Sequence, residues 1–264
     1  MSDLRETYAK PEIHQAWESV YRSNPRQDRL NDLLLERVLR LVAPPPAARF
    51  LDAGCGVGDH TIRIAQRGFR CVGVDISQTV LQHAQRNAQA AGVAPLVRFS
   101  QQALEELSFA DGSFEVVHCR GVLTHVPHWE RALSHLCRVL KPGGSIVIFE
   151  LNRRSLEANI VMLARRLMKR SSTLVVTPGG WEFWSEENGS PFVMRIFNLQ
   201  HVLEQLEQNR IVLTHRFASE FWDINRLPSG FMRNLGILFN RVWFSSRLPA
   251  AWSSGNALIG SKAG

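Results

Sequence analysis

The sequence is poor in cysteine, and no pair of its cysteines is spaced for metal binding. It has four in 264 residues, and none forms a C-x-x-C pattern: Cys55, Cys71, Cys119 and Cys137. This spacing argues against the common zinc and disulfide frameworks. We therefore expect reduced thiols in a cytoplasmic protein that holds no metal ion.

Long apolar runs and an excess of acidic residues are also missing. The first residues, MSDLRETYAK, lack the apolar core of a signal peptide, and no run is long enough to span a membrane. The positive charge is uneven: residues 1–150 carry a net charge of +1, whereas residues 151–264 carry +6 and five of the seven tryptophans. We expect cofactor chemistry in the first part and substrate contacts in the second.

Strand and helix signals alternate between residues 49 and 150. Apolar strand-like runs occur at 49–52, 71–75, 96–100, 114–119 and 145–150, with helical periodicity at 59–67, 78–91 and 129–140 between them. Helices of this length between strands predict parallel pairing through right-handed crossovers. The fold class is therefore α/β, with a doubly wound, mostly parallel sheet. Three consecutive prolines end a helical segment at residues 1–43 that precedes this sheet.

A glycine-rich loop follows the first expected strand. The stretch LDAGCGVG, residues 51–58, leads from that strand into a helix, where backbone N–H groups can meet a ligand. The next strand ends in Asp75, about 20 residues further on, which is where an acid that binds the two ribose hydroxyls is expected. Loop, strand and acid together predict a cofactor that contains a nucleoside.

The loop lacks the features that phosphate-containing cofactors need. No Gly-Lys-Ser/Thr follows, so it is not a P-loop, and the third glycine of the dinucleotide fingerprint is replaced by Asp59. A carboxylate there repels a pyrophosphate, whereas S-adenosylmethionine carries an ammonium and a sulfonium. Asp52, two residues before Gly54, fits the same cationic ligand.

Further motifs point to one family. The blocks LDAGCGVG, GVDIS, LSFADGSFEVV, VLTHVP and RVLKPGG occur in this order between residues 51 and 144. Together they resemble the class I S-adenosylmethionine-dependent methyltransferases of small molecules over roughly residues 48–150. The resemblance implies a seven-stranded Rossmann-like sheet, with a helical lid inserted after the fifth strand. It also implies S-adenosyl-L-methionine as the cofactor.

The resemblance implies a set of cofactor contacts at the carboxyl ends of the strands. They are Asp52, Gly54, Gly56 and Arg120 at the methionine part, Asp75 at the ribose and Ile76 at the adenine, and Gln102, Ala103 and Leu104 at the adenine edge. Position 102 departs from the family, which usually has an aspartate there. The amide oxygen of Gln102 can still accept a hydrogen bond.

The implied reaction is methyl transfer to an O, N or C nucleophile of a small, largely apolar acceptor, which can be acidic or lipid-like. Nucleic-acid methylation is the main alternative because of the positive charge. The motif of amino-directed nucleic-acid enzymes is absent, however, and the chain has His118-Cys119-Arg120-Gly121 in its place. A protein that holds the cofactor without transferring methyl is a third alternative.

Two histidine-containing segments have open roles. His125 follows the fourth strand, where it can either take a proton from the acceptor or orient neighbouring groups. His14, Trp17 and Tyr21 share one helix face, which can cover the cofactor or pack on the domain.

The chain is expected to have three parts: an N-terminal helical segment at 1–46, the cofactor-binding core at 47–151, and substrate-lid insertions with the last strands at 152–264. Residues 153–170 form a basic amphipathic segment, which suits a lid, a peripheral membrane contact or a solvated helix. We expect an aromatic-rich loop at 177–191, a helix at 199–209 and a strand at 210–217. Residues 218–249 are expected to be irregular, and 252–261 to form the last strand.

Overall fold

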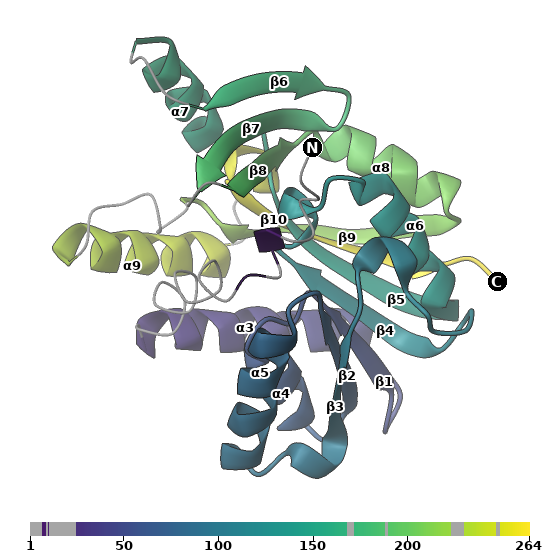
Figure 1. The fold of residues 1–264 in the computed structure, drawn as a ribbon. Helices are drawn as coiled ribbons and strands as arrows, with labels where there is room; N and C mark the ends of the chain where they lie inside the picture. The colour runs from purple at the N-terminus through teal and green to yellow at the C-terminus, as the bar shows by residue number, and fades with distance from the viewer. Residues whose placement is uncertain are drawn as a thin grey trace.

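A seven-stranded sheet forms the centre of the protein (Figure 1). The structure is a computed structural model that describes residues 7–8, 10, 25–167, 172–187, 190–222, 230–246 and 249–264. The strand order is β3-β2-β1-β4-β5-β10-β9. The strands are β1 (Arg49–Ala53), β2 (Arg70–Asp75), β3 (Val97–Gln101), β4 (Phe114–Arg120), β5 (Leu140–Leu151), β9 (Ile211–Glu220) and β10 (Gly255–Lys262). The expected fold class is confirmed.

Pairing within the sheet is parallel except at one strand. β1 pairs in parallel with β2 and β4, β2 with β3, and β4 with β5, whereas β10 runs antiparallel to both β5 and β9. Because β1 to β5 are parallel, their carboxyl ends meet at one edge of the sheet. Ligands of open α/β sheets bind at that edge, outside the carboxyl ends of the strands.

Helices cover both faces of the sheet. Helices α3 (Pro25–Val42), α4 (Asp59–Ala65) and α5 (Gln78–Ala90) pack on one face through an apolar cluster that includes Leu34, Ile64 and Ala88. Helices α6 (Trp129–Val139) and α8 (Leu199–Gln208) pack on the other face through Leu133 and Val202. These positions follow the helical periodicity of the sequence, which brings them onto one face of each helix.

The insertion after β5 is only partly helical, which corrects the expectation of a helical lid. Helix α7 (Leu156–Leu167) is followed by a separate antiparallel sheet of β6 (Thr173–Thr177), β7 (Gly180–Glu187) and β8 (Ser190–Phe197). The expected loop at 177–191 is therefore largely strand. Its aromatic residues favour a half-buried sheet, and Gly180 permits a close approach, since a Cβ there would lie 2.2 Å from the Ile196 carbonyl oxygen.

The structure also contains a helix near the C-terminus that the sequence analysis did not predict. Residues 218–249 were expected to be irregular, but α9 (Phe231–Ser245) is a helix whose Ile237 and Phe244 are buried. The short turns η1 (Ala94–Leu96), η2 (Leu104–Glu106), η3 (Leu123–His125) and η5 (Ala250–Trp252) complete the described elements. Among the described residues, no helix has the length and apolar character needed to cross a membrane. His14, Trp17 and Tyr21 lie outside the described residues.

Candidate cofactor and acceptor site

The glycine loop between β1 and α4 has the backbone that its sequence predicts. Gly54 has φ +69°, and a Cβ there would lie 2.4 Å from Val122, so only glycine fits this position. Gly56 has φ +54°, and a Cβ there would meet no atom within 4 Å. The loop is therefore tightly packed at Gly54 and open at Gly56, where a ligand can approach the main chain.

Asp75 at the end of β2 faces this open part of the loop. One of its carboxylate oxygens accepts a hydrogen bond from the Gly56 N–H at 3.0 Å, and the other accepts from the Ser77 N–H at 3.0 Å. The residue is 8% exposed. The structure thus joins the predicted ribose acid to the predicted glycine loop, and the N–H donors hold its carboxylate in place.

Asp52, in contrast, accepts hydrogen bonds from neighbouring side chains with both of its carboxylate oxygens. Its Oδ2 accepts a hydrogen bond from Thr61 Oγ1 at 2.6 Å, and its Oδ1 accepts one from His118 Nδ1 at 2.9 Å. Both Asp52 and His118 are almost fully buried. This arrangement links β1, α4 and β4 directly below the loop. A direct contact between Asp52 and the cofactor stays a prediction.

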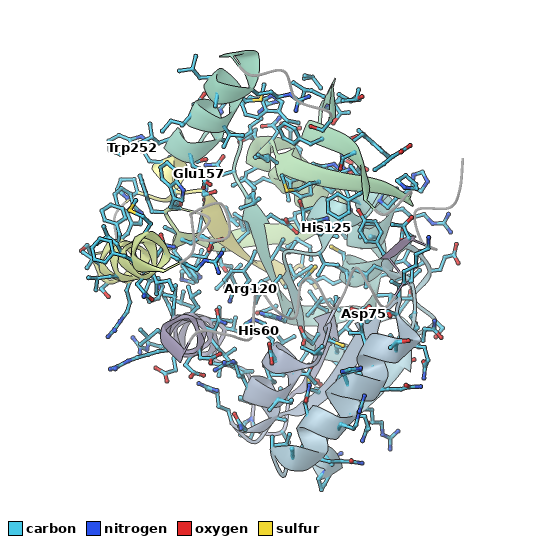
Figure 2. All side chains as sticks on the ribbon, turned by 60° about the vertical axis from the view of Figure 1, so that its left-hand side comes forward. His60, Asp75, Arg120, His125, Glu157 and Trp252 are labelled. Atoms are coloured by element: carbon cyan, nitrogen blue, oxygen red, sulfur yellow. The ribbon has the colours of Figure 1, made fainter. Side chains whose placement is uncertain are left out.

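His60 of α4 lies beside His118 and Arg120 of β4. The His60 and His118 rings lie 5.0 Å apart, and Arg120 lies 5.1 Å from the Phe149 ring centroid. Burial, followed by the charge of Arg120, lowers the pKa of His60 well below its usual value. His60 is therefore neutral, and the positive charge here belongs to Arg120. Figure 2 shows Arg120 between His60 and His125.

The residues expected at the adenine follow β2 and β3. Ile76 packs against a cluster formed by Tyr8, Phe192 and Val193. Gln102 donates its backbone N–H to the Asp75 carbonyl, which places it beside Asp75. Its amide oxygen accepts from the Ser108 backbone N–H and hydroxyl, so that oxygen is already used within the chain.

Ala103 and Leu104 lie at the start of the turn η2. Ala103 is the residue before this turn, and Leu104, its first residue, is buried. The two residues follow directly after Gln102, on the same side of the sheet as Asp75. Their contact with the adenine edge stays a prediction.

His125 lies under the second sheet. Its Nδ1–H donates to the Val193 carbonyl at 3.0 Å, and its ring lies 5.8 Å from Tyr8 and 5.2 Å from Phe192. Burial lowers the pKa of His125 to about 4. The side chain is therefore neutral at physiological pH, with Nε2 as its acceptor, and it is a weak base.

A buried arginine attaches the second sheet to the turn that carries His125. The Arg195 guanidinium, 1% exposed, binds Glu182 at 2.9 Å and donates to the backbone carbonyls of Leu123 and Val126 at 3.0 Å. Thr124 Oγ1 donates to the Arg195 carbonyl and accepts from its N–H. Strand β8 and turn η3 thus form one unit.

Glu150 is a further buried acid at the end of β5. It is 3% exposed, and neither carboxylate oxygen has a hydrogen-bond partner within the described part of the chain. Burial raises its pKa to about 8, and the nearby backbone of residues 122–124 and the charge of Arg195 only partly oppose the increase. The carboxyl group is therefore mostly protonated at neutral pH.

Tyr8, Arg195 and Glu150 were not singled out from the sequence. Glu150 had a visible signal, because an acid ends the apolar run IVIFE at the ligand edge of the sheet. Tyr8 and Arg195 had none, because their partners lie 185 and about 70 residues away along the chain. Within the described ranges, no group of three His, Cys, Asp or Glu side chains could hold a metal ion.

Comparisons with known proteins agree with this geometry. Residues 51–148 match the family model described as a methyltransferase domain. A ubiquinone biosynthesis O-methyltransferase of Alkalilimnicola ehrlichii is 30% identical over 171 residues, 64% of this chain and 66% of that protein. A ubiquinone/menaquinone biosynthesis C-methyltransferase of Bartonella bacilliformis is 33% identical over 138 residues, 47% of this chain and 53% of that protein.

A solved structure supports the fold over a larger part of the chain. The PH0226 protein of Pyrococcus horikoshii has a TM-score of 0.63 at 17% identity, over 96% of this chain and 99% of that one. The chain spans only about half to two thirds of the length of the two curated relatives. The matched domain and the fold nevertheless agree with the motifs, and residues 51–148 form a methyltransferase domain of the class I S-adenosylmethionine-dependent kind.

Proposed function

We propose that the protein transfers the methyl group of S-adenosyl-L-methionine to an O, N or C nucleophile of a small, largely apolar acceptor. The observation that carries this proposal is the pair formed by Gly56 and Asp75, with an open main chain on one side and a fixed carboxylate on the other. These groups suit a ribose and a cationic amino acid without a phosphate. Asp59, which begins α4, disfavours a pyrophosphate at the same place.

Bound S-adenosylmethionine supplies an activated methyl group, so the chain mainly has to bind and orient the two reactants. Asp75 accepts hydrogen bonds from the ribose, and Ile76 packs on the adenine together with Ala103 and Leu104. Arg120 receives the carboxylate of the methionine part, while Gly54 and Gly56 let the main chain approach it. Asp52 fixes β1 to α4 through Thr61 and to β4 through His118.

The acceptor approaches from the side of the second sheet. Tyr8, Phe192 and His125 present aromatic surface there, and His125 is neutral. We infer that His125 orients the acceptor or its neighbours and does not act as a strong base. The two relatives named for quinone biosynthesis support an apolar, ring-containing acceptor.

The test begins with cofactor binding. Isothermal titration calorimetry should show binding of S-adenosylmethionine and S-adenosylhomocysteine, and none of NAD. Asp75→Ala should weaken binding by about 2–3 kcal/mol, because charge-assisted hydrogen bonds to the ribose are lost. Glu207→Ala, on the exposed surface of α8, is the matched control. Equal affinities for Asp75→Ala and the control would refute the assignment of Asp75.

Turnover with a labelled methyl group then separates the alternatives. Label transferred to quinone-like or other apolar small molecules supports the proposal, and label in nucleic acid supports the rival activity. Cofactor binding without transfer to any of the acceptor classes would favour a protein that only holds the cofactor. We also propose that the protein acts in the cytoplasm and that its parts are residues 1–46, 47–151 and 152–264.

We further propose a peripheral membrane contact through α7 and α9. Helix α7 exposes Leu156, Ile160 and Leu163, and Trp252 of η5 is 63% exposed. Helix α9 exposes six large apolar side chains, namely Phe231, Met232, Leu235, Leu238, Phe239 and Val242. Its sequence contains two arginines and no acid. Figure 1 shows both helices projecting from the same side of the protein, which suits an anionic bilayer surface.

Vesicle co-sedimentation tests this contact. The wild type should bind vesicles that contain anionic lipid, and Leu235→Glu with Leu238→Glu should reduce that binding by about tenfold or more. Val212→Glu changes an exposed apolar residue of the edge strand β9 and serves as the control. Equal binding of both variants would contradict the proposal. If the wild type forms a dimer and the double variant is a monomer, the surface belongs instead to an interface with a second copy of the chain.

A further inference from the structure

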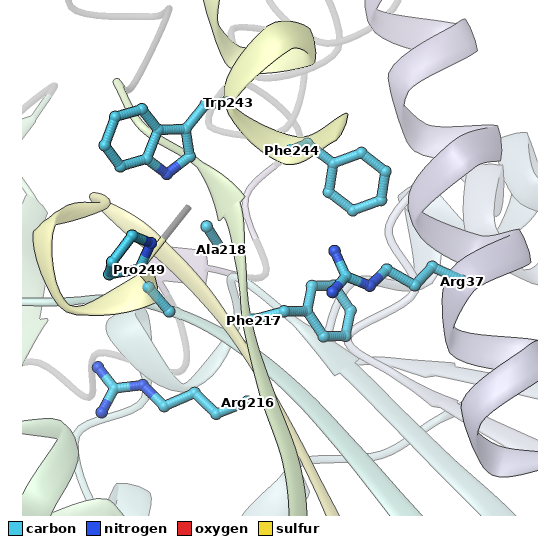
Figure 3. A pocket seen from close by; sticks show the side chains of 8 residues that line it. Arg37, Arg216, Phe217, Ala218, Trp243, Phe244 and Pro249 are labelled. Atoms are coloured by element: carbon cyan, nitrogen blue, oxygen red, sulfur yellow. The ribbon is translucent and has the colours of Figure 1, made fainter. Parts of the chain in front are cut away.

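Two arginines from distant parts of the chain reach the surface beside the turn η5, outside the cofactor site. Arg154 follows the end of β5, Arg216 lies in the edge strand β9, and both are exposed. Figure 3 shows the Arg216 side chain leaving β9 on the side of Pro249, away from Phe217 and Arg37. Alternate residues of a strand point to opposite faces, so Arg216 belongs to the face opposite to Phe217. We call Arg154 and Arg216 the arginine pair.

Two buried asparagines attach the arginine pair to η5. Asn152 donates its amide N–H to a carbonyl of η5 at 2.9 Å, and its Oδ1 accepts the Arg154 backbone N–H at 3.0 Å. Asn256 donates to another carbonyl of η5 at 3.1 Å, and its Oδ1 accepts the Arg216 Nε–H at 2.8 Å. Because one turn binds both asparagines, the fold brings the two arginines to the same place.

No acid neutralises the arginine pair. Within the described ranges Arg154 forms no ion pair, and Arg216 donates only to the neutral Asn256. Glu157 and Glu220, the acids closest to the pair along the chain, are not its partners among these residues. Loss of water around the guanidinium, followed by the charge of Arg154, lowers the pKa of Arg216. The two positive charges therefore repel each other, and an anion between them would relieve that repulsion.

The chemistry of the arginine pair suits a phosphate group. The planar fork of N–H donors on a guanidinium matches two phosphate oxygens. The Nη groups of Arg216 have no bond within the described part of the chain, and Asn256 already restrains the side chain, so binding costs less rotamer freedom. An exposed ion pair alone contributes little, however, so a ligand at this place needs further contacts.

Apolar side chains next to the arginine pair can supply those contacts. Leu156, two residues after Arg154, begins α7 and is exposed, as are two further apolar residues of that helix. Trp252 lies in η5, the turn that holds both asparagines, and is 63% exposed. Tryptophan favours the boundary between lipid head groups and hydrocarbon. Two cations beside an exposed apolar surface match the charge and the layering of an anionic bilayer.

We propose that the arginine pair binds the phosphate of an anionic phospholipid at a membrane surface. This inference rests on the membrane contact proposed above and names the chemical group that the contact recognises. The guanidinium groups of Arg154 and Arg216 donate to the phosphate oxygens, while Leu156 and Trp252 enter the apolar boundary beneath it. Asn256 holds Arg216 in the orientation that this binding needs.

Vesicle co-sedimentation of the full chain tests the arginine pair. It needs neither S-adenosylmethionine nor an acceptor, so its outcome is independent of methyl transfer. The wild type should bind vesicles of phosphatidylcholine and phosphatidate more tightly than vesicles of phosphatidylcholine alone. Arg154→Gln with Arg216→Gln should weaken binding to the phosphatidate vesicles about thirtyfold, about fivefold for each charge removed. Its binding to phosphatidylcholine alone should not change, whereas Leu235→Glu with Leu238→Glu should weaken binding to both.

Arg70→Gln with Arg98→Gln is the matched control, because it removes the same charge from exposed positions of β2 and β3, near the opposite edge of the sheet. Binding to phosphatidate vesicles should change less than about twofold, since salt screens distant charges. Circular dichroism verifies that each variant is folded. Equal weakening in the two arginine variants would overturn the proposal and leave the membrane contact standing.

Two further results would also contradict the inference, each for a different reason. A wild type that binds neither kind of vesicle would refute the membrane contact itself, and the lipid ligand with it. Inorganic phosphate is the second probe, titrated by calorimetry. If the wild type binds it, the variant of the arginine pair does not, and both bind phosphatidate vesicles equally, the pair holds a soluble anion instead of a lipid.

Discussion

Glu150 should make the stability of the protein fall as the pH rises from neutral to 8. Its pKa is about 8 in the folded state, because the side chain is buried, and near 4.5 when unfolded. Between these values the native state binds more protons than the unfolded state, so the free energy of unfolding decreases with pH. The contribution is fully present below pH 4.5 and is lost as the pH passes through 8.

The magnitude follows from the same two values. With a folded pKa of about 8, the loss between pH 6.5 and 8 amounts to roughly 1.5–2 kcal/mol. His125 has the opposite sign, because its pKa is lowered to about 4 by burial. The stability that it contributes is present above its unfolded value of 6.5 and is lost as the pH falls through 4. The two groups oppose one another between pH 4.5 and 6.5, so the contribution of Glu150 is best measured between pH 6.5 and 8, as the difference between the wild type and a Glu150 variant.

Urea denaturation of the wild type and of Glu150→Gln at several pH values measures this effect. The quantity to compare is the change in the free energy of unfolding with pH, because the buried glutamine amide alters the absolute stability. The decrease between pH 6.5 and 8 should be smaller by about 1.5–2 kcal/mol in the variant. Glu207→Gln, at an exposed site of α8, should keep the wild-type slope. Parallel slopes for wild type and Glu150→Gln would show that Glu150 is ionised in the native state.

Three further predictions concern the site. Arg195→Met should lower the free energy of unfolding by about 3–5 kcal/mol in urea, because Glu182 loses its buried partner, whereas Arg86→Met on the exposed face of α5 should have little effect. Gly54→Ala should weaken S-adenosylmethionine binding at least about tenfold by calorimetry, since its Cβ would lie 2.4 Å from Val122; Gly92→Ala, with open space around it, should bind normally. The pH profile of kcat/KM should show no inflection near 6.5 from His125, and one that disappears in His125→Gln would contradict its neutral, weakly basic character.

The sequence alone predicts those parts of the fold and the site that depend on a local residue pattern. The alternation of strands and helices between residues 49 and 150 follows from periodicity, and the glycine loop and Asp75 lie where spacing along the chain puts them. The start of β5 differs: it begins at Leu140 rather than 145, because pairing with Phe114 extends the strand through the Pro-Gly-Gly turn. Pairing between distant strands is not visible in a local pattern.

The second sheet shows the same limit more clearly. Glycine and proline at 178–180 predicted a loop, yet they form the turn between β6 and β7, and the aromatic residues that follow pair as strands. The orientation of Arg195 depends on Glu182 and on turn η3, some 70 residues earlier. No spacing rule connects these residues, so their contribution to the site appears only in three dimensions.

These contacts change which part of the insertion is best placed to cover the acceptor. A lid was one of three interpretations of the basic segment at 153–170, but Leu156 is 52% and Leu163 58% exposed, so the apolar face of α7 is turned toward solvent. Strand β8, in contrast, accepts the His125 N–H at Val193, which also bonds both ways with the Tyr8 hydroxyl. Because β8 is fixed to η3 by Arg195, we propose the second sheet and Tyr8, rather than α7, as the cover of the acceptor side. The exposed faces of α7 and α9 are then available for the membrane contact that we propose.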